Sequence, residues 1–393
     1  MADKLSILTA TTLFPNPVQR ALGVFVETRL RHLLASGEVT AHVLAPIPWL
    51  PPMVRYSSYG PLQTVPSREQ RNGLIVEHPR YLVVPKFGMT LTPLTLYRAM
   101  RKRFVALLKE GHRFDLIDAH YFYPDGVAAV RLAREFNLPV TVTARGTDLN
   151  LIPEFPAPRK MILDAASKAD GMITVCQALK DTLIEMGVAD ERVTVLRNGV
   201  DLDLFRPIDR AAARSALGLS RRTLASVGLL IDRKGHHHII RALKDLPDND
   251  LLIAGDGPDR RALERLAVEE GVADRVRFLG SVDQNRLREI YNAVDALVLA
   301  SSREGWANVL LESMACGTPV VASAVWGTPE VVARPEAGVL MPSLDPQGVA
   351  EGVRRLFAAY PDREATRRYA EGFNWNATTE GQLKLFRGIL ARR

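Results

Sequence analysis

The sequence predicts an α/β protein with two domains, each built on a parallel sheet with helices on both faces. The chain has 393 residues, of which 47% are hydrophobic and 24% charged, enough for two or three domains with full cores. Short β-branched segments alternate with amphipathic segments along most of the chain, which indicates parallel sheets. The alternation restarts near residue 207. We therefore expect two such domains, with a ligand cleft between them at the carboxyl ends of the strands.

The first part of the chain carries the segments expected of one such domain. Residues 5–10, LSILTA, form a predicted strand, and residues 24–35 have apolar side chains at helical spacing. Further predicted strands lie at residues 39–46, 74–78, 115–120, 140–144, 171–176 and 193–198. We assign residues 1–205 to an N-terminal domain.

The second part repeats the pattern after the helical segment 210–218. Predicted strands lie at residues 223–230, 250–255, 275–280, 296–301 and 318–323. We assign residues 206–372 to a C-terminal domain. Residues 373–393 contain a last helix with Leu383, Phe386 and Leu390 on one face, and we expect it to cross back to the N-terminal domain.

Charge and cysteine content restrict the class of protein. The net charge is +7, so nucleic acid, anionic lipid head groups and phosphorylated small molecules are all open as partners. Cys176 and Cys316 lie far apart in apolar segments, which favours a reduced cytoplasmic protein over a disulfide scaffold. The N-terminal apolar run is too short for a signal peptide, and no segment reaches membrane-spanning length.

Several nucleotide and metal motifs are disfavoured. The chain lacks a P-loop, and Arg260 stands where the third glycine of a dinucleotide fingerprint would be. Residues 236–238 read HHH, but consecutive helical side chains diverge by about 100° and cannot converge on one ion. Two Asp-x-Asp matches, at residues 201–203 and 248–250, do not clearly follow buried strands. We therefore expect neither a nicotinamide cofactor nor a metal site.

Residues 304–312, EGWANVLLE, place two carboxylates around the expected start of a helix. Glu304 is the first acidic residue past the carboxyl end of the preceding predicted strand, and Glu312 lies in the predicted helix itself. Free backbone N–H groups at such a start bind anions, whereas carboxylates accept hydrogen bonds from vicinal hydroxyls. The arrangement suits a diphosphate flanked by a ribose and a sugar. From the spacing alone, two solvated glutamates at a helix start remain the commoner explanation.

The wider context resembles a known family. Glu304 and Glu312, with GWANVLL between them, are similar to the paired-glutamate signature of retaining nucleotide-sugar glycosyltransferases of family 4, which have the GT-B fold. Further segments resemble the family in the same order: PNP…ALGVFVETRLRHL, DLIDAHYFYPDG, TARGTDL, VLRNGVDLDLFRP, SVGLLIDRKG, LLIAGDGPDR, VRFLGSV and ACGTPVVAS…GTPEVV. The resemblance runs from about Leu5 to Trp375. It implies two Rossmann-like domains that face each other across a deep cleft.

The resemblance also implies a role for each matching residue. Glu304 would contact hydroxyls of the transferred sugar, and Glu312 the ribose hydroxyls. Arg233 and Lys234 would neutralise charge on the leaving diphosphate, and His120 would lie near the reacting carbon. The other donor-site residues that it implies are Gly23, Arg145, Asp148, Leu279, Gly305, Trp306, Ala307, Asn308, Val309 and Leu310.

Each of these residues also has a plainer explanation. An Arg-Lys pair is often a solvated pair at a helix start, a lone histidine is more often structural, and Gly23 could be an ordinary turn glycine. The sequence also departs from the family pattern at three places. Leu229 stands where the family often has an arginine, Arg145 where it commonly has a histidine, and Gly305-Trp306-Ala307-Asn308 where it has Gly-Phe-Gly-Asn. These departures bear on the preferred sugar.

The expected function is transfer of a sugar, with retention of configuration and without a metal or cofactor, from a nucleoside-diphosphate sugar such as a UDP or GDP sugar. The acceptor would be a glycan or lipid-linked molecule in cell-surface polysaccharide biosynthesis. Residues 49–73 are expected to form a long irregular stretch, and residues 92–111 a helix with a basic face: Arg98, Arg101, Lys102, Arg103 and Lys109. Such a face suits an anionic membrane surface, or else is merely solvated. We therefore expect a cytoplasmic protein, which is peripheral at the inner face of the cell membrane if this face binds lipid.

Three alternatives stay open at this stage. A nucleotide-sugar 2-epimerase of the same fold would use the same donor without an acceptor. A non-catalytic glycan-assembly scaffold would keep the fold alone, although the four residues Arg233, Lys234, Glu304 and Glu312 argue against it. A nucleic-acid binder is disfavoured because no aromatic platform or recognisable motif accompanies the charge. The sequence does not identify the nucleobase, the sugar, the acceptor or the oligomeric state.

Overall fold

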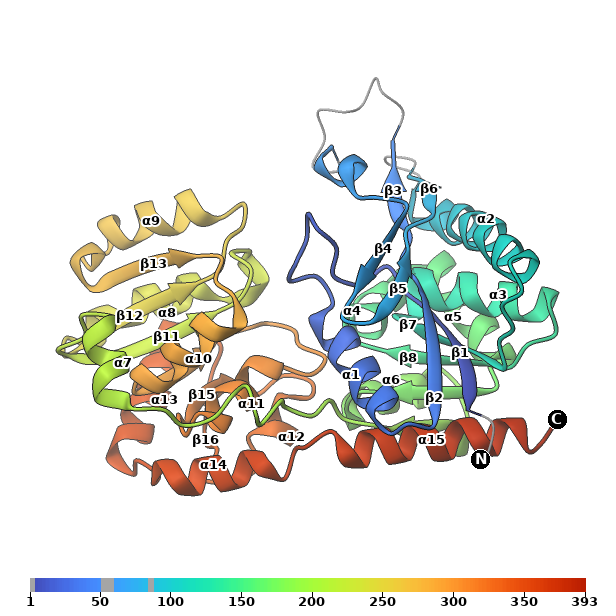
Figure 1. Cartoon of the computed structure of the whole chain (residues 1–393). Coiled ribbons are helices and arrows are strands. Elements are labelled where there is room, and N and C mark those ends of the chain that lie inside the picture. Colours follow the sequence, from blue (N-terminus) through green and yellow to red (C-terminus); the bar gives the residue numbers. More distant parts are fainter. Residues whose placement is uncertain (1–3, 51–59, 84–87) are drawn as a thin grey trace. The chain divides into compact units, whose positions relative to one another are not determined.

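The computed structural model describes residues 4–50, 60–83 and 88–393, and the chain divides into two compact units (Figure 1). Unit 1 comprises Met1–Arg197 and Asn376–Arg393, and unit 2 comprises Asn198–Trp375. The second unit begins at Asn198, whereas the sequence placed the start of that domain at residue 206. The N–H of Val200 donates to the carbonyl of Phe373 (2.9 Å), which ties this segment to unit 2.

Unit 1 contains ten strands and the helices that cover them, among the described residues. The strands are β1 (Leu5–Ala10), β2 (Val39–Leu44), β3 (Ile47–Trp49), β4 (Arg68–Arg71), β5 (Leu74–Glu77), β6 (Arg80–Leu82), β7 (Leu116–His120), β8 (Val140–Ala144), β9 (Gly171–Thr174) and β10 (Val193–Val195). The helices are α1 (Val24–Ala35), α2 (Gly88–Lys109), α3 (Val127–Glu135), α4 (Thr147–Asn150), α5 (Pro156–Lys168), α6 (Gln177–Glu185) and α15 (Asn376–Leu390), with short helical turns η2 (Pro61–Thr64) and η3 (Phe122–Gly126).

The main sheet of unit 1 has the order β10-β9-β8-β7-β1-β2-β5-β4, and β3 pairs with β6 in a separate two-stranded sheet. Within the main sheet only the β4–β5 pairing is antiparallel among the pairings described. Strand β1 has β2 on one side and β7 on the other. The chain order therefore reverses at β1 and β7, and ligands of parallel sheets bind at the carboxyl ends beside such a reversal.

Unit 2 is a six-stranded sheet with helices. Its strands are β11 (Arg222–Val227), β12 (Asn249–Ala254), β13 (Val276–Gly280), β14 (Ala296–Leu299), β15 (Val320–Ser323) and β16 (Gly338–Met341). Its helices are α7 (Arg210–Ala216), α8 (His236–Ala242), α9 (Arg260–Glu269), α10 (Gln284–Ala293), α11 (Asn308–Ala315), α12 (Thr328–Val331), α13 (Pro346–Ala358) and α14 (Arg363–Glu371), with a short turn η6 (Asp232–Lys234).

All the strand pairings described in unit 2 are parallel, in the order β13-β12-β11-β14-β15-β16. Strand β11 has β12 on one side and β14 on the other, so the order reverses between β11 and β14. The apolar residues of β11, β12 and β14 share one buried cluster with those of α8, α9 and α13. This core fixes the strand ends from which the loops of the candidate site emerge.

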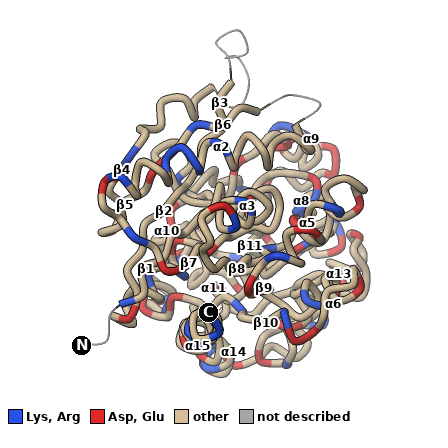
Figure 2. The backbone as a smooth tube through the Cα atoms, turned by 90° about the vertical axis from the view of Figure 1, so that its right-hand side faces the viewer, with Lys and Arg blue, Asp and Glu red and all other residues tan. Residues whose placement is uncertain are grey.

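The structure corrects several expectations about single segments. Residues 49–73 were expected to be irregular, but among their described residues η2 and β4 form, and residues 51–59 lie outside the described part. The last helix spans Asn376–Leu390 and belongs to unit 1. Its buried face includes Leu383 and Phe386 as expected, but Ile389 takes the place expected for Leu390. Figure 2 shows α15 nearly end-on beside the C-terminus, with Lys and Arg positions on its coil. Lys384 and Arg387 of this helix are exposed.

Candidate functional site

The loops that follow β11 and β14 meet beside the reversal of the second sheet. The carbonyl of Arg233 accepts the N–H of Ser302 (2.9 Å), and its guanidinium donates to the carbonyl of Arg303 (2.6 Å). Gly235 has φ 67°, and a Cβ at this position would lie 1.8 Å from the carbonyl oxygen of Ala300. Only glycine permits both that backbone conformation and that close approach. The local fold thus holds the two loops together by main-chain contacts.

This junction joins two residues that the sequence singled out. Lys234 Nζ donates to Glu304 Oε1 (2.6 Å), and the two side chains are only 16% and 10% exposed. The attraction between the two charges offsets part of the cost of removing both groups from water. Lys234 and Glu304 are 70 residues apart, yet both lie at the carboxyl ends of neighbouring strands.

The first turn of α11 follows directly from this junction. Ala307 is its N-cap and its side chain makes no capping bond. The N–H groups of Asn308 and Leu310 donate to the carbonyls of Trp306 and Ala307 (3.1 Å each), which leaves the N–H of Val309 in this turn available to an anion. Residues 305–307 lie in the loop and residues 308–310 in the first turn of α11, as the sequence predicted. Asn198, which the sequence did not single out, donates from its amide to Asn308 Oδ1 (3.3 Å). Asn198 is the first residue of unit 2, so the start of this unit contacts the first residue of α11.

Glu312 lies one turn further along α11 and faces the interior of unit 2. Burial raises the pKa of its carboxyl to about 7, although the hydrogen bond from Tyr291 acts in the opposite direction. The hydroxyl of Tyr291 donates to Glu312 Oε2 (3.1 Å), and Tyr291 itself is fully buried. Tyr291 was missed because a tyrosine in an amphipathic helix carries no sequence signal for such a bond. Near neutral pH Glu312 is therefore divided between its neutral and its charged form.

Three glycine-rich strand ends complete this edge of the second sheet. The N–H of Gly228 donates to Ala254 (3.0 Å) and that of Gly255 to Gly280 (2.8 Å). A Cβ at Gly255 would lie 1.8 Å from the carbonyl oxygen of Gly228. Leu279, half-buried in β13, stands at the same edge. The structure thus brings the predicted donor-site residues of unit 2 to the carboxyl ends of adjacent strands.

A second group of predicted residues lies at the reversal of the first sheet. Gly23 is the N-cap of α1 with φ 65°, and a Cβ there would lie 2.1 Å from the carbonyl oxygen of Leu13. The loop that follows β1 is therefore folded back tightly on itself. Phe25, two residues further on, lies with its ring under the guanidinium of Arg145 (5.5 Å to the ring centre). Gly23 and Arg145 consequently belong to one cluster.

The same cluster contains His120 and Asp148. His120 ends β7 and is almost fully buried, with Nε2 3.2 Å from Asp118 and Nδ1 2.6 Å from Arg145 Nη2. Asp148 accepts the backbone N–H groups of Phe122, Arg145 and Gly146. Burial raises the pKa of Asp148 in spite of these bonds. Asp148 therefore shapes the loop, and both ring nitrogens of His120 have partners inside unit 1.

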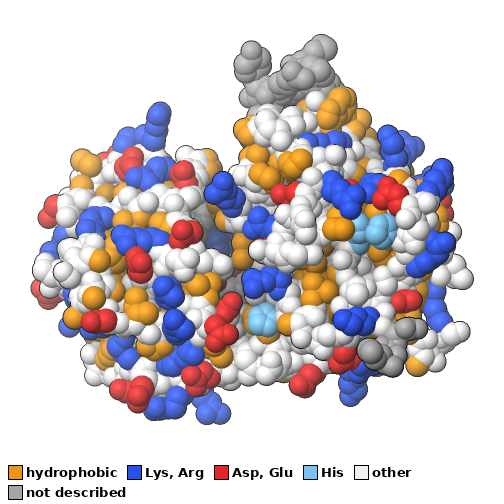
Figure 3. Space-filling view, in the orientation of Figure 1, with side chains coloured by type: hydrophobic (Ala, Val, Ile, Leu, Met, Phe, Trp, Pro, Cys, Tyr) orange, Lys and Arg blue, Asp and Glu red, His pale blue; other side chains and the backbone are white. Residues whose placement is uncertain are grey.

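Of the three consecutive histidines, His237 and His238 are in ring contact (4.0 Å between ring centres), whereas His236 has partners of its own. His236 Nδ1 contacts the hydroxyl of Ser226 (2.9 Å) and Nε2 the carbonyl of Leu229 (3.2 Å), while His237 faces Asp232 (3.7 Å). Within residues 4–50, 60–83 and 88–393, no three histidine, cysteine, aspartate or glutamate residues are grouped so that they could hold a metal ion. The space-filling view in Figure 3 shows mixed charges over both units.

Comparison with known proteins identifies the family. Residues 25–204 match Glycosyltransferase Family 4, and residues 208–373 match Glycosyl transferases group 1. Proteins named D-inositol 3-phosphate glycosyltransferase are among the relatives. The one from Mycobacteroides abscessus is 32% identical over 320 residues, covering 76% of this chain and 71% of the relative. The one from Frankia alni is 32% identical over 313 residues, covering 72% and 76%.

Solved structures show the same fold. Sucrose-phosphate synthase from Thermosynechococcus elongatus superposes with a TM-score of 0.82 at 23% identity, covering all of both chains. The Anabaena protein Alr3699/HepE, solved with UDP and glucose, gives 0.74 at 19% identity, covering 97% of this chain and 98% of that one. The prediction of two Rossmann-like domains is confirmed. The chain belongs to the group 1 glycosyltransferases of family 4 and has the GT-B fold.

Proposed function

We propose that this glycosyltransferase moves a sugar, with retention of configuration and without a metal ion, from a nucleoside-diphosphate sugar to a hydroxyl of a glycan or lipid-linked acceptor of the cell surface. The observation that carries the proposal is the Lys234–Glu304 pair beside the start of α11, with Glu312 a turn further in. Cations and free N–H groups suit a diphosphate, and carboxylates suit the hydroxyls on either side of it.

The proposed chemistry assigns one task to each group. The bond between the anomeric carbon and the phosphate oxygen breaks, and Lys234, Arg233 and the first turn of α11 stabilise the charge on the departing diphosphate. The acceptor oxygen bonds to the anomeric carbon from the same face, and its proton passes to the departing phosphate oxygen. Glu304 would hold sugar hydroxyls and Glu312 the ribose hydroxyls. In this assignment the donor binds mainly to unit 2 and the acceptor to unit 1.

Nucleotide binding tests the donor site first. The melting temperature is measured with a panel of nucleoside diphosphates and nucleotide sugars for the wild type, for Glu312→Ala and for Glu336→Ala. Glu336 is an exposed glutamate of the same unit and serves as the matched control. We expect stabilisation by one nucleoside diphosphate that is reduced in Glu312→Ala alone. No stabilisation of the wild type by any of them would contradict the proposal and favour a scaffold that keeps only the fold.

Product analysis then tests the reaction. The anomeric configuration of the product is determined by NMR after incubation with donor and acceptor, and we expect it to match that of the donor. An inverted product would refute the retaining mechanism. Conversion of the donor sugar in the absence of any acceptor would indicate a nucleotide-sugar 2-epimerase instead. Addition of a chelator should leave the rate unchanged if the reaction needs no metal ion.

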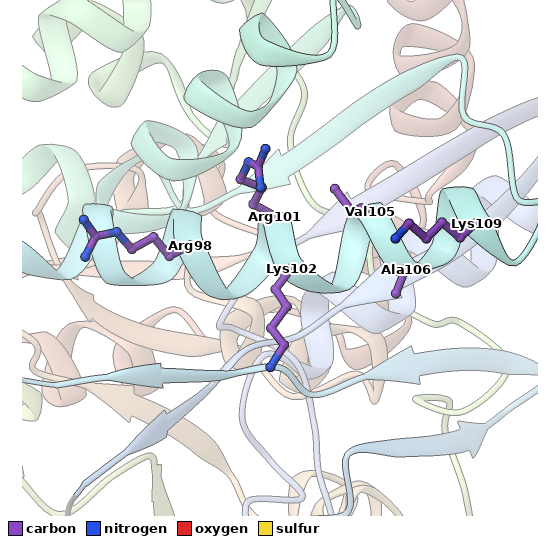
Figure 4. Close-up of a pocket in the computed structure, with 6 residues that line it drawn as sticks. All are labelled: Arg98, Arg101, Lys102, Val105, Ala106 and Lys109. Atoms are coloured by element: carbon purple, nitrogen blue, oxygen red, sulfur yellow. The ribbon is translucent and has the colours of Figure 1, made fainter.

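For the acceptor, the basic face of α2 supports a partner at an anionic membrane. Arg98, Arg101, Lys102 and Lys109 line, with Val105 and Ala106, a hollow of about 410 Å³ along α2 (Figure 4). Arg101 is paired with Glu135 (2.7 Å) and Arg103 with Glu77 and Glu110. Among the described residues no carboxylate lies within ion-pair distance of the other three cations of the hollow. Their charges can attract phosphate head groups, at about 1 kcal/mol each.

Exposed apolar residues lie next to this helix. Trp49 and Leu82 are paired across β3 and β6, and Met89 and Leu91 lie in the first turn of α2; all four are about two-fifths exposed. Thr95 of α2 donates to the carbonyl of Leu82 (2.7 Å), so the helix and the small sheet are in contact. Hydrophobic side chains gather around β3 and β6 in Figure 3. Apolar residues beside a basic helix are typical of a surface that rests on a membrane. No described helix is long and apolar enough to cross one.

Vesicle binding tests this part of the proposal. Lys102→Glu/Lys109→Glu is compared with Arg261→Glu/Arg265→Glu, which changes the same charge on the exposed face of α9 in unit 2. We expect the wild type and the α9 variant to sediment with vesicles that contain anionic lipid at low salt, and the α2 variant to stay in solution. Equal binding by both variants would show that net charge alone is responsible. Because relatives are named for D-inositol 3-phosphate, phosphorylated inositols belong in the acceptor panel beside lipid-linked sugars.

A further inference from the structure

A chain of buried hydrogen bonds and one close His–Asp contact links the last helix of the protein to His120. It runs from Arg29 in α1 through Gln382 in α15 to Asp118 and His120 in β7, and ends at Arg145 after β8. All five side chains are buried, and all belong to unit 1. We call these five residues the relay. None of Arg29, Asp118 and Gln382 is required by the assignment of donor and acceptor roles given above.

The first links fix the direction of an amide. Arg29 Nε donates to Gln382 Oε1 (2.9 Å), and Gln382 Nε2 donates to Asp118 Oδ2 (2.8 Å). Arginine has no acceptor, and an ionised carboxylate has no donor. A flipped amide would therefore set N–H against N–H on one side and oxygen against oxygen on the other. Arg29 and Asp118 thus allow a single orientation of Gln382.

The next links fix the proton on His120. Burial raises the pKa of the Asp118 carboxyl, but the contact with His120, the charge of Arg29 and the bond from Thr141 (2.9 Å) outweigh it and hold the pKa below its usual value. Asp118 is therefore an acceptor, so Nε2 of His120 carries the hydrogen. Burial lowers the pKa of His120 to about 4 against the attraction of Asp118, which keeps the ring neutral at pH 7. Its Nδ1 is then free to accept a hydrogen bond from Arg145 Nη2.

We propose that Gln382 is a positioning residue of the transfer reaction: with Arg29 and Asp118 it holds His120 in one neutral tautomer, whose Nδ1 aims the guanidinium of Arg145 at the carboxyl end of β8. Leu383, Phe386 and Ile389 already anchor α15 in an apolar cluster with α1 and β1. The amide of Gln382 adds two directional hydrogen bonds to these apolar contacts, one from a cation and one to a carboxylate. Buried networks of this kind specify geometry because each member has one satisfied arrangement. The catalytic consequence rests on the proposed function, whereas the tautomer does not.

Steady-state kinetics with a matched control tests the consequence. Gln382→Met keeps the shape of the side chain but removes both hydrogen bonds, so we expect kcat to fall about ten- to a hundredfold, as for a small misplacement of a reacting group. The KM for the nucleotide sugar should change less than kcat, because the donor residues of unit 2 are untouched and Arg145 is the one donor-site residue that the relay reaches. Leu383→Ala leaves a cavity on the same helix and lowers stability without removing a hydrogen bond of the relay. Its kcat, measured where both variants are folded, should stay close to that of the wild type.

A second variant, Gln382→Glu, gives a pH dependence of kcat that is not expected if Gln382 only anchors α15. Gln382→Glu keeps an acceptor for Arg29 but sets a carboxyl group against Asp118. When protonated, the new carboxyl can donate to Asp118 as the amide did; when ionised, it repels Asp118. We expect kcat of this variant to approach that of the wild type at low pH and to fall as pH rises, with Gln382→Met showing no such rescue.

The tautomer is observed directly, without substrate, from the ¹⁵N chemical shifts of His120. We expect protonated Nε2 and unprotonated Nδ1 in the wild type, and a displaced Nε2 shift in Gln382→Met, because Asp118 loses the amide that orients it. An Nε2 shift that Gln382→Met leaves unchanged would overturn the inference, as would a kcat equal to that of the wild type or a matching loss in Leu383→Ala. If the wild type transferred sugar from no donor, the proposed function would fail, and the chemical shifts would still decide whether the relay sets the tautomer.

Discussion

The Nζ of Lys234 lies 2.6 Å from Oε1 of Glu304, which joins the loops that follow β11 and β14. These strands are neighbours at the point where the order of the second sheet reverses. The carboxylate holds the ammonium group in place before any ligand arrives, at a position where parallel sheets bind ligands. A cation that is already ordered loses less side-chain entropy when a diphosphate binds.

The pair predicts different kinetic effects for its two members. In Glu304→Ala, Lys234 keeps its charge and loses its competitor, so nucleoside diphosphate affinity should be unchanged or higher. Its kcat should fall by about a hundredfold or more, because the contacts to the transferred sugar act in the transition state. Lys234→Met should lower both affinity and kcat. Calorimetry with the nucleoside diphosphate and steady-state kinetics measure the two quantities. Equal losses of binding and kcat in Glu304→Ala would show that Glu304 only binds the donor.

Glu312 predicts that nucleotide affinity depends on pH. In the proposed donor site the ribose hydroxyls donate to the ionised carboxylate of Glu312, whose pKa is about 7 in the folded protein. Affinity should therefore rise as pH increases through 7 and should lose this dependence in Glu312→Gln. Tyr291→Phe is the matched control, because removing the bond that lowers this pKa should move the midpoint to higher pH. Titrations from pH 5 to 9 measure it, and a midpoint that Tyr291→Phe leaves in place would assign the effect to another group.

The free protein should respond to pH in the opposite sense. The folded pKa of Glu312 is raised from 4.5, so its contribution to stability is full below about pH 4.5 and is lost as pH rises through 7. The loss amounts to at most roughly 3 kcal/mol, since the side chain keeps some contact with solvent. In urea unfolding, the free energy of unfolding of Glu312→Gln relative to the wild type should be higher at pH 8 than at pH 5. A constant difference between the two proteins would contradict the raised pKa.

The sequence was sufficient to predict the strands and the strand ends that carry the candidate site. Buried parallel strands such as β8 are continuous β-branched runs, and chain order places their carboxyl ends on one edge. Glu304 and Lys234 could therefore be assigned to that edge without a structure. The family resemblance added their roles, and the comparisons confirm the family.

The polar partners of these residues could not be predicted in the same way. Gln382 and Asp118 are 264 residues apart, and the apolar spacing of α15 indicates which face is buried but not what an amide on that face contacts. Tyr291 and Asn198 likewise look like ordinary members of a helix and a loop. Hydrophobic periodicity predicts burial, whereas hydrogen bonds between distant segments depend on the register of packed elements.

The close approach of Gly235 to the backbone of Ala300 predicts that Gly235→Ala loses more stability than the left-handed conformation alone would cost. Gly235 and Gly218 have similar φ angles of 67° and 61°, but a Cβ at Gly218 would have nothing within 4 Å. Gly218→Ala therefore measures the cost of the left-handed conformation, about 1–2 kcal/mol. Gly235→Ala should cost more, because its Cβ meets the carbonyl of Ala300, and it should also weaken nucleotide binding by displacing Lys234. Unfolding and nucleotide titrations compare the two, and equal costs would mean that the loops simply move apart.

Asp125 predicts a pH-dependent stability that has its origin in unit 1. The carboxyl is fully buried and accepts the N–H (2.5 Å) and the hydroxyl (3.0 Å) of Thr12. Burial raises its pKa from 3.8 to about 8, although both bonds to Thr12 oppose the shift. A raised folded pKa means that the stabilising contribution is full below about pH 4 and is lost as pH rises through 8.

Asp125→Asn removes the titration while its amide oxygen can still accept the N–H of Thr12. The free energy of unfolding of this variant, relative to the wild type, should therefore increase between pH 4 and pH 8 and level off above. Thr12→Val is the control. It removes the hydroxyl bond that lowers the pKa of Asp125, so in this background the stability gained by Asp125→Asn should keep increasing to a higher pH. Urea unfolding across this range measures both curves. A relative stability that stays flat with pH would show that Asp125 is already ionised at neutral pH, so that the Thr12 bonds outweigh its burial.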